Sequence, residues 1–287
     1  CRHLRDHGAG YDRVITGPYL FGLVHHAARV DPRRILLVPC LHDEPFAYLA
    51  CMRDLFNSVA GCLFNSEPER DLAQRLYRFD PARGVVVGMG FDPFDADPAA
   101  FAARHALTTP YVIYSGRREG GKGIPLLTDY MHTFRARTGR DIKLVFTGSG
   151  PIDAPAGLWP HIIDVGFVSE AEKHEAMAGA LTFIHPSLLE SFGIVLLESF
   201  MARTPALVHA ESAVLRWQCE RSGAGLWFRT YPEFEETLVM LAEQPGLRRT
   251  LGEHGRAFVL REYAWPAVER RLFQAIDATF PKAVAIG

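Results

Sequence analysis

The sequence has little that would suit a membrane-spanning, nucleic-acid-binding or disulfide-rich protein. No apolar run in its 287 residues approaches the ~20 residues that a membrane helix needs. The formal net charge of −2 and a pI near 6.7 give no case for a nucleic-acid partner. Five cysteines, an odd number without a C-x-x-C pair, favour a reduced cytosol over a disulfide framework or a zinc site. What is present is an ordinary globular composition, 48% hydrophobic and 22% charged, long enough for two domains.

Short apolar runs alternate with helical stretches along most of the chain. Strands are expected first at residues 14–16, 35–38, 61–65 and 85–87, and then at 111–114, 143–146, 162–165, 181–184, 206–208 and 225–228. This alternation is typical of parallel α/β sheets, and the second series is enough for a complete doubly wound domain. Residues 88–98, rich in Gly, Asp and Pro, predict a linker between the two series. Helices are also expected between the first strands, at 45–59 and at 67–77, the latter with Ser66 as its cap and a proline near its first turn. From residue 231 to about 280 the chain is expected to be helical, with breaks near Pro245 and Pro266.

The most informative stretch is residues 183–198. An apolar run ends at His185, a polar loop carries Glu190, and Gly193 opens an apolar helix that carries Glu198. Such a strand, loop and helix N-terminus can hold a diphosphate, because the first helical N–H groups are unpaired and the helix dipole is positive there. Two glutamates eight residues apart can reach different hydroxyls of one ligand. The alternative is a buried strand–helix unit with two solvated carboxylates, in which His185 is mainly a core histidine.

Three further loops follow expected strands. Residues 115–123 carry Arg117 and Lys122, and fixed cations in a dry cleft would stabilise the charge that develops on a leaving diphosphate. The alternative for this loop is a solvated turn with ordinary surface charges. The turn at 147–151 contains two glycines that allow close backbone approach. Ser169, with Glu172 three residues later, predicts a capping box at the start of a helix.

Taken together, these motifs resemble those of the retaining glycosyltransferase family four, which has the GT-B fold and includes sucrose and mannosyl transferases. The similar patterns are V-x-x-G-x-D at 87–92, G-R-x-x-x-x-K-G at 116–123, G-x-G-P at 148–151 and H-P-S-x-x-E-S-F-G-x-x-x-x-E at 185–198. The resemblance implies two doubly wound Rossmann-like domains with a cleft between them. It implies a partial acceptor-side domain over 1–98, joined by a C-terminal helix at 265–287, and a donor-binding domain over 99–264.

The resemblance also implies roles for single residues. Arg117 and Lys122 would contact the donor diphosphate, Glu190 the transferred sugar and Glu198 the ribose, while His42 would face the sugar from across the cleft. Asp43, the next residue, is expected to orient the His42 imidazole or to cap the helix that starts at Pro45. The other donor contacts that it implies are Gly116, Gly148, Gly150, Val168, Ser191, Phe192, Gly193, Ile194 and Val195. Among these, the backbone of Val168 would hold the base.

The implied activity is retaining transfer of a sugar from a UDP- or GDP-linked donor to an acceptor hydroxyl, without a metal or another cofactor. The acceptor is left open among a glycan, a lipid-linked acceptor and a small molecule. The alternative is a non-catalytic nucleotide-sugar-binding module or subunit that needs a partner for activity. A cytoplasmic location is expected, with peripheral association at the inner membrane face left open.

The front of the sequence departs from the family. There, a strand, a Gly-Gly loop and further β units begin the first domain, and none of them precedes Cys1. Without them an apolar strand edge would be uncovered. We therefore expect a segment outside this sequence, a second polypeptide or a partner protomer to supply the missing strands. A smaller departure is Arg203, which stands where the family often has a glycine suited to a left-handed helix cap.

Overall fold

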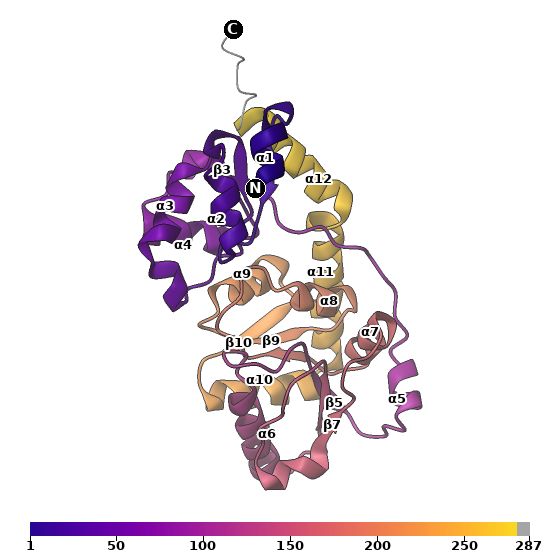
Figure 1. Ribbon diagram of the computed structural model, residues 1–287. Helices are drawn as coiled ribbons and strands as arrows, with labels where there is room; N and C mark the ends of the chain where they lie inside the picture. Colours follow the sequence, from indigo (N-terminus) through magenta and orange to yellow (C-terminus); the bar gives the residue numbers. More distant parts are fainter. Residues whose placement is uncertain (280–287) are drawn as a thin grey trace. The chain divides into compact units, whose positions relative to one another are not determined.

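A computed structural model of the chain describes residues 1–279 and divides into two compact units (Figure 1). Unit 1 consists of Cys1–Gly90 with Tyr263–Gly287, and unit 2 is Phe91–Glu262. The sequence-based division places these boundaries at 98/99 and 264/265. The last residues of the predicted C-terminal helix, 280–287, lie outside the described residues.

Unit 1 is built on a parallel sheet in the order β1-β2-β3-β4. Its strands are Val14–Thr16, Ile35–Leu37, Gly61–Phe64 and Gly84–Val86, and its helices are α1 (Arg2–His7), α2 (Gly22–Ala28), α3 (Ala50–Ser58), α4 (Glu67–Tyr77) and α12 (Trp265–Gln274). The central strands β2 and β3 are buried along their whole length, as expected for strands covered on both faces. Their core is largely aromatic, with Phe56 contacting the rings of Tyr19, Tyr77 and Phe79.

Two local predictions in unit 1 fare differently. The start of α4 is confirmed, because the Ser66 hydroxyl accepts the Glu69 N–H at 3.2 Å, with a proline in the first turn. The helix expected from Pro45 is interrupted: a short 3-10 segment covers Pro45–Tyr48, and the extended Leu49 separates it from α3.

Unit 2 contains a parallel sheet in the order β10-β9-β8-β5-β6-β7, with a strand at each of the positions expected from the sequence. The strands are β5 (Tyr111–Ser115), β6 (Lys143–Thr147), β7 (Ile162–Asp164), β8 (Phe183–His185), β9 (Ala206–His209) and β10 (Gly225–Phe228). The helices are α5 (Ala100–Arg104), α6 (Ile124–Thr138), α7 (Glu170–Ala178), α8 (Ile194–Met201), α9 (Ala213–Ser222), α10 (Tyr231–Glu243) and α11 (Pro245–Glu262).

The order of the strands in unit 2 contains a switch point. From β5 the chain proceeds to β6 and β7 on one side of the sheet, and then returns to β8 and proceeds to β9 and β10 on the other. Ligands of parallel α/β sheets bind outside the carboxyl ends of the strands at such a point. In unit 2 this directs attention to the loops that follow β5 and β8.

Helices cover both faces of this sheet. Side chains of α6 and α10 share one apolar cluster with strand residues such as Tyr114, Phe146 and Phe228, and these two helices lie on the same side of the sheet in Figure 1. Helices α7, α8 and α11 pack together away from that cluster. Burial on both faces explains why the strands read as continuous apolar runs.

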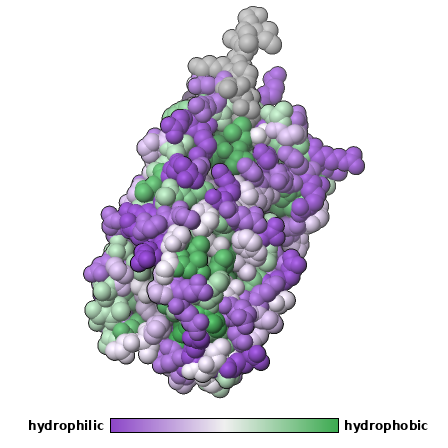
Figure 2. Space-filling model, turned by 180° about the vertical axis from the view of Figure 1, so that it is seen from behind, coloured by the Kyte–Doolittle hydropathy of each residue, from purple (hydrophilic) through white to green (hydrophobic). Residues whose placement is uncertain are grey.

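The conformation of Arg203, the lengths of the helices and the character of the surface can be compared with what the sequence led us to expect. Arg203 has a φ of 59°, the left-handed conformation for which the family often uses glycine. Within residues 1–279, no helix combines the length and the apolar character that crossing a membrane requires. Hydrophilic and hydrophobic side chains are intermixed over the face seen in Figure 2.

Candidate donor site

Two adjoining cavities lie at the switch point of unit 2. The larger, about 360 Å³, is lined by Tyr114, Ser115, Gly116, Arg117, Lys122, His185, Glu190, Gly193, Ile194 and Val195. The smaller, about 160 Å³, shares four of these residues and is also lined by Thr147, Gly148, Ser149, Phe167, Val168, Glu170 and Lys173. The loops after β5, β6 and β8 and the start of α8 therefore converge on one place, as the carboxyl ends of neighbouring parallel strands should.

A cluster of three charged or titratable side chains lies in the larger cavity. Lys122 Nζ donates to Glu190 Oε1 at 2.6 Å, and His185 Nε2 lies 3.1 Å from the same oxygen. Burial alone would raise the pKa of Glu190, but the His185 hydrogen bond and the Lys122 ammonium together lower it to about 2. Glu190 is therefore a fixed carboxylate at neutral pH. His185, expected mainly as a core residue, is buried and also holds this carboxylate.

Close contact between two glycines brings the loops after β5 and β6 together. Gly148 has a φ of 106°, and a Cβ added to it would lie 2.2 Å from the carbonyl oxygen of Gly116. Only glycine permits both that conformation and that approach. The next glycine of the turn, Gly150, lies beneath Arg118, and it does not line either cavity.

The two arginines of the β5 loop have different surroundings. Arg118 is buried and pairs with both oxygens of Asp164 at 3.2 and 3.1 Å, so it holds the loop in place. Arg117 is mostly exposed, lies 3.2 Å from Glu119, and lines both cavities. Arg117 is thus the arginine of this loop that can reach a bound anion.

Helix α8 begins at the cavity. Gly193, in the left-handed conformation, is its N-cap, and Gly193, Ile194 and Val195 line the larger cavity. The positive end of the helix dipole and the first unpaired N–H groups therefore face the space beside Lys122. Ser191 and Phe192 precede them and are not among the lining residues.

Glu198 lies deeper, one turn into α8, and contacts a residue that the sequence did not single out. Lys173 Nζ lies 3.0 Å from Glu198 Oε1 and 2.7 Å from Glu170 Oε2. Burial raises the pKa of Glu198, and the Lys173 ammonium opposes this. Glu198, Glu170 and His174 offer ligand atoms within 4.8 Å of one another, a spacing that could hold a metal ion, but the Lys173 ammonium already contacts both carboxylates.

Sequence reasoning missed Lys173 because its partner is 25 residues away, on another helix. It also missed Phe167, whose side chain lines the smaller cavity and is 88% exposed. The signal in the sequence is an aromatic residue directly before Val168, whose backbone is expected to contact the base.

His42 lies in unit 1, in the loop that follows β2. Its Nδ1 is 3.9 Å from Glu44 Oε1, which accepts the Tyr19 hydroxyl at 2.8 Å. Asp43, expected to orient His42 or to cap the next helix, accepts hydrogen bonds from Tyr48 and Arg75 instead of capping. The role of His42 toward a donor sugar stays a prediction.

Buried Glu69 holds the loop that carries His42. Its two carboxylate oxygens accept the backbone N–H groups of Leu41 at 2.7 Å and of Asn65 at 2.6 Å. One side chain of α4 thus connects the loops after β2 and β3. The sequence does not indicate this arrangement, because acidic residues are common in the first turn of a helix and Glu69 is one of them.

Comparison with known proteins decides the family. The sequence profile of the family described as "Glycosyl transferases group 1" matches residues 96–258, more than half of the chain. The chain belongs to this family. Alpha-D-kanosaminyltransferase of Streptomyces kanamyceticus is 28% identical to the chain in an alignment of 238 residues, which covers 77% of the chain and 61% of that protein. D-inositol 3-phosphate glycosyltransferase of Frankia alni is 28% identical in an alignment of 268 residues, which covers 85% of the chain and 65% of that protein.

Solved structures agree on the fold of this family member. HepE of Anabaena, solved with UDP, has a TM-score of 0.80 at 14% identity, covering 96% of this chain and 81% of HepE. Sucrose-phosphate synthase of Thermosynechococcus elongatus has a TM-score of 0.75 at 20% identity, covering 94% and 74%. At such low identities the likeness concerns the fold, and it confirms the predicted GT-B type with Rossmann-like α/β units.

Proposed function

We propose that this chain moves a sugar from a nucleoside-diphosphate donor, linked to UDP or GDP, to an acceptor hydroxyl, with retention of the anomeric configuration. The observation that carries the proposal is the cluster of Lys122, Glu190 and His185 beside the start of α8. In this cluster the Glu190 carboxylate can accept hydrogen bonds from sugar hydroxyls. The Lys122 ammonium and the N-terminus of α8 can bind phosphate.

In this proposal the diphosphate lies between the start of α8 and the β5 loop. Lys122, Arg117 and the N–H groups of Gly193, Ile194 and Val195 would contact it, and the Gly116 and Gly148 turns would leave room for it. When the bond from the anomeric carbon to the phosphate oxygen breaks, its electron pair stays on the diphosphate. Fixed cations and helix N–H groups stabilise that charge as it develops.

Retention follows if the acceptor attacks from the side that the leaving group vacates. The leaving phosphate oxygen takes the proton of the acceptor hydroxyl, and the acceptor oxygen bonds to the anomeric carbon on the same face. Glu190 would accept hydrogen bonds from the transferred sugar and hold it during this step. His42 would face the sugar, as the family resemblance implies.

The nucleoside would extend into the smaller cavity. Glu198 would bind the ribose hydroxyls, with Lys173 holding its carboxylate, and the backbone of Val168 would bind the base. We propose that transfer needs no metal, because lysine and arginine side chains already supply the positive charge. The proposal leaves the acceptor open among a glycan, a lipid-linked acceptor and a small molecule.

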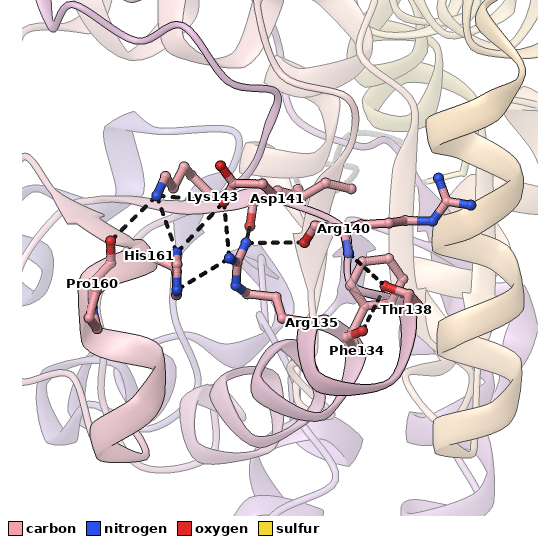
Figure 3. Close-up of polar contacts among 9 residues, drawn as sticks. Phe134, Arg135, Thr138, Arg140, Asp141, Lys143, Pro160 and His161 are labelled. Atoms are coloured by element: carbon pink, nitrogen blue, oxygen red, sulfur yellow. Dashed lines mark hydrogen bonds and ion pairs between the residues drawn. The ribbon is translucent and has the colours of Figure 1, made fainter.

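A comparison of two lysines tests the role of the cluster. Lys122→Ala should lose most turnover of UDP-glucose or GDP-mannose, because the diphosphate loses one of the two side-chain cations proposed to bind it. Lys143→Ala is the matched control. Its side chain is 22% exposed, against 25% for Lys122, and it also lies near a carboxylate, in a network with Asp141 and His161 (Figure 3). Lys143 is the first residue of β6, so it lies at the amino ends of the strands, whereas the donor cavities lie at their carboxyl ends. Its loss should therefore leave turnover unchanged.

Three further measurements, on a Glu190 variant, on a metal-free reaction and on the configuration of the product, complete the test. Glu190→Ala should lose turnover while circular dichroism shows an intact fold, and excess EDTA should leave wild-type turnover unchanged. The sugar released or transferred early in the reaction should keep the donor's anomeric configuration by NMR. Wild-type-like rates in Lys122→Ala would refute the assignment. Nucleotide binding without any transfer or donor hydrolysis would favour the non-catalytic alternative.

A further inference from the structure

A second large groove lies in unit 2, away from the cluster of Lys122 and Glu190. Its volume is about 600 Å³, and it is lined by Ala210, Arg216, Trp227, Arg229, Pro232, Glu233, Glu236 and Thr237. These residues come from the loop after β9, from α9, β10 and the loop after β10, and from the first turns of α10. Figure 1 shows α9, β10 and α10 next to one another at one edge of the sheet. A groove of this size matches a small-molecule or glycan site.

Trp227 provides the apolar part of the groove. Along β10, Leu226 and Phe228 pack into the core under α6 and α10, so the intervening Trp227 points to the opposite face. There the residue remains 41% exposed. Exposed tryptophan and arginine side chains in a concave surface are typical of binding sites, because they offer large contact areas together with hydrogen bonds.

The charges around Trp227 restrict the kind of ligand. Arg216 is paired with Glu220 at 3.1 Å, and Arg229 lies 3.7 Å from Glu211. Glu233, which also lines the groove, caps α10 by accepting the N–H groups of Arg229 and Thr230 at 2.7 and 2.9 Å. Positive and negative side chains therefore balance, which disfavours a polyanion, and their number disfavours a wholly apolar ligand.

We propose that this groove binds a neutral sugar unit of a glycan. A pyranose ring has an apolar C–H face, which can stack on the Trp227 indole, and hydroxyls at its rim, which can donate to Glu236 and accept from Arg216 or Arg229. That combination of one flat apolar face and a polar rim is what the lining residues offer. This binding needs no residue of the proposed donor site, because the groove shares no lining residue with the two donor cavities.

The groove lies at the carboxyl ends of the strands, as the donor cavities do, which suggests what a sugar bound there could do. Arg229 and Ala210 follow the carboxyl ends of β10 and β9, on the same edge of the sheet as the donor cavity at β8. In the order β10-β9-β8, two strand spacings separate β10 from β8, about 10 Å in all. The groove would hold a sugar of a glycan chain close to, but outside, the place of transfer.

Tryptophan fluorescence and calorimetry can test this proposal with maltohexaose, cellohexaose and linear mannohexaose as probes, and a heparin oligosaccharide as the polyanion control. At least one neutral probe should bind the wild-type chain saturably. Trp227→Ala should weaken that binding by about tenfold or more, and Glu236→Gln should weaken it less. Trp159→Ala is the matched control, because Trp159 is 48% exposed and lies outside the groove.

A thermal-shift titration with UDP separates this proposal from the proposed function. UDP should stabilise the wild-type chain and Trp227→Ala equally, because Trp227 lies outside the donor cavities. The glycan site is refuted if none of the neutral probes binds, if Trp227→Ala binds them as tightly as the wild type, or if heparin binds this groove more tightly than they do. None of these results depends on whether the chain transfers sugar.

Discussion

Replacing Glu190 by glutamine tests whether its carboxylate is held as an anion. Glutamine has the same shape and is neutral, so it imitates the protonated carboxyl group. Glu190 has an ordinary pKa of 4.5, lowered to about 2 in the folded chain, although burial opposes the shift. At about 1.4 kcal/mol for each pH unit, this difference corresponds to about 3 kcal/mol. The side chain is only 14% exposed, so solvent screens little of it.

The sign of the effect sets its pH dependence. A lowered carboxylate pKa stabilises the folded state fully above pH 4.5, and the stabilisation is lost as the pH falls from 4.5 through 2. Glu190→Gln should therefore lower the free energy of unfolding by about 3 kcal/mol at pH 7. Near pH 3, one pH unit above the pKa in the folded chain, the difference between variant and wild type should fall to about 1.4 kcal/mol, since the carboxyl group of the unfolded wild type is then mostly protonated.

Urea unfolding followed by tryptophan fluorescence measures this free energy, since Trp159, Trp217 and Trp227 all lie in unit 2. Glu119→Gln serves as the control, because that carboxylate pairs with Arg117 at the surface and should contribute less than about 1 kcal/mol. A loss below about 1 kcal/mol at pH 7 in Glu190→Gln would refute the reasoning. So would a loss that stays constant between pH 7 and pH 3.

Two further predictions concern the loops. Glu69→Ala leaves two buried backbone N–H groups without their acceptor, and each such loss costs about 1–3 kcal/mol. Urea unfolding should therefore show a free energy of unfolding lower by about 2–6 kcal/mol. Glu67→Ala, at an exposed position of the same helical turn, should change it little. Gly148→Ala places a Cβ 2.2 Å from a backbone oxygen at a positive φ, so it should weaken UDP binding by about tenfold or more in calorimetry. Gly120→Ala, which meets nothing within 4 Å, should bind UDP normally, and equal affinities in the two variants would contradict the proposed position of the glycine turns.

Much of the fold could be predicted from local patterns. The strands of unit 2 and the capped start of α4 follow from apolar runs, caps and turn residues within a few positions of one another. The helix expected from Pro45 was only partly right, because the extended Leu49 interrupts it. Such interruptions depend on how a segment packs, and a periodic pattern does not report them.

The motifs of the donor site could also be recognised in the sequence, but the side chains that their residues contact could not. The sequence by itself indicated Lys122, Glu190 and Gly193, since each stands beside an expected strand end or helix start. Only the tertiary structure placed Lys122 against Glu190, 68 residues away, and Lys173 against Glu198. These pairs form because β5 and β8 are neighbours in the sheet and α7 packs on α8. Strand order and helix packing are properties of the whole chain, whereas propensities and caps act over single turns.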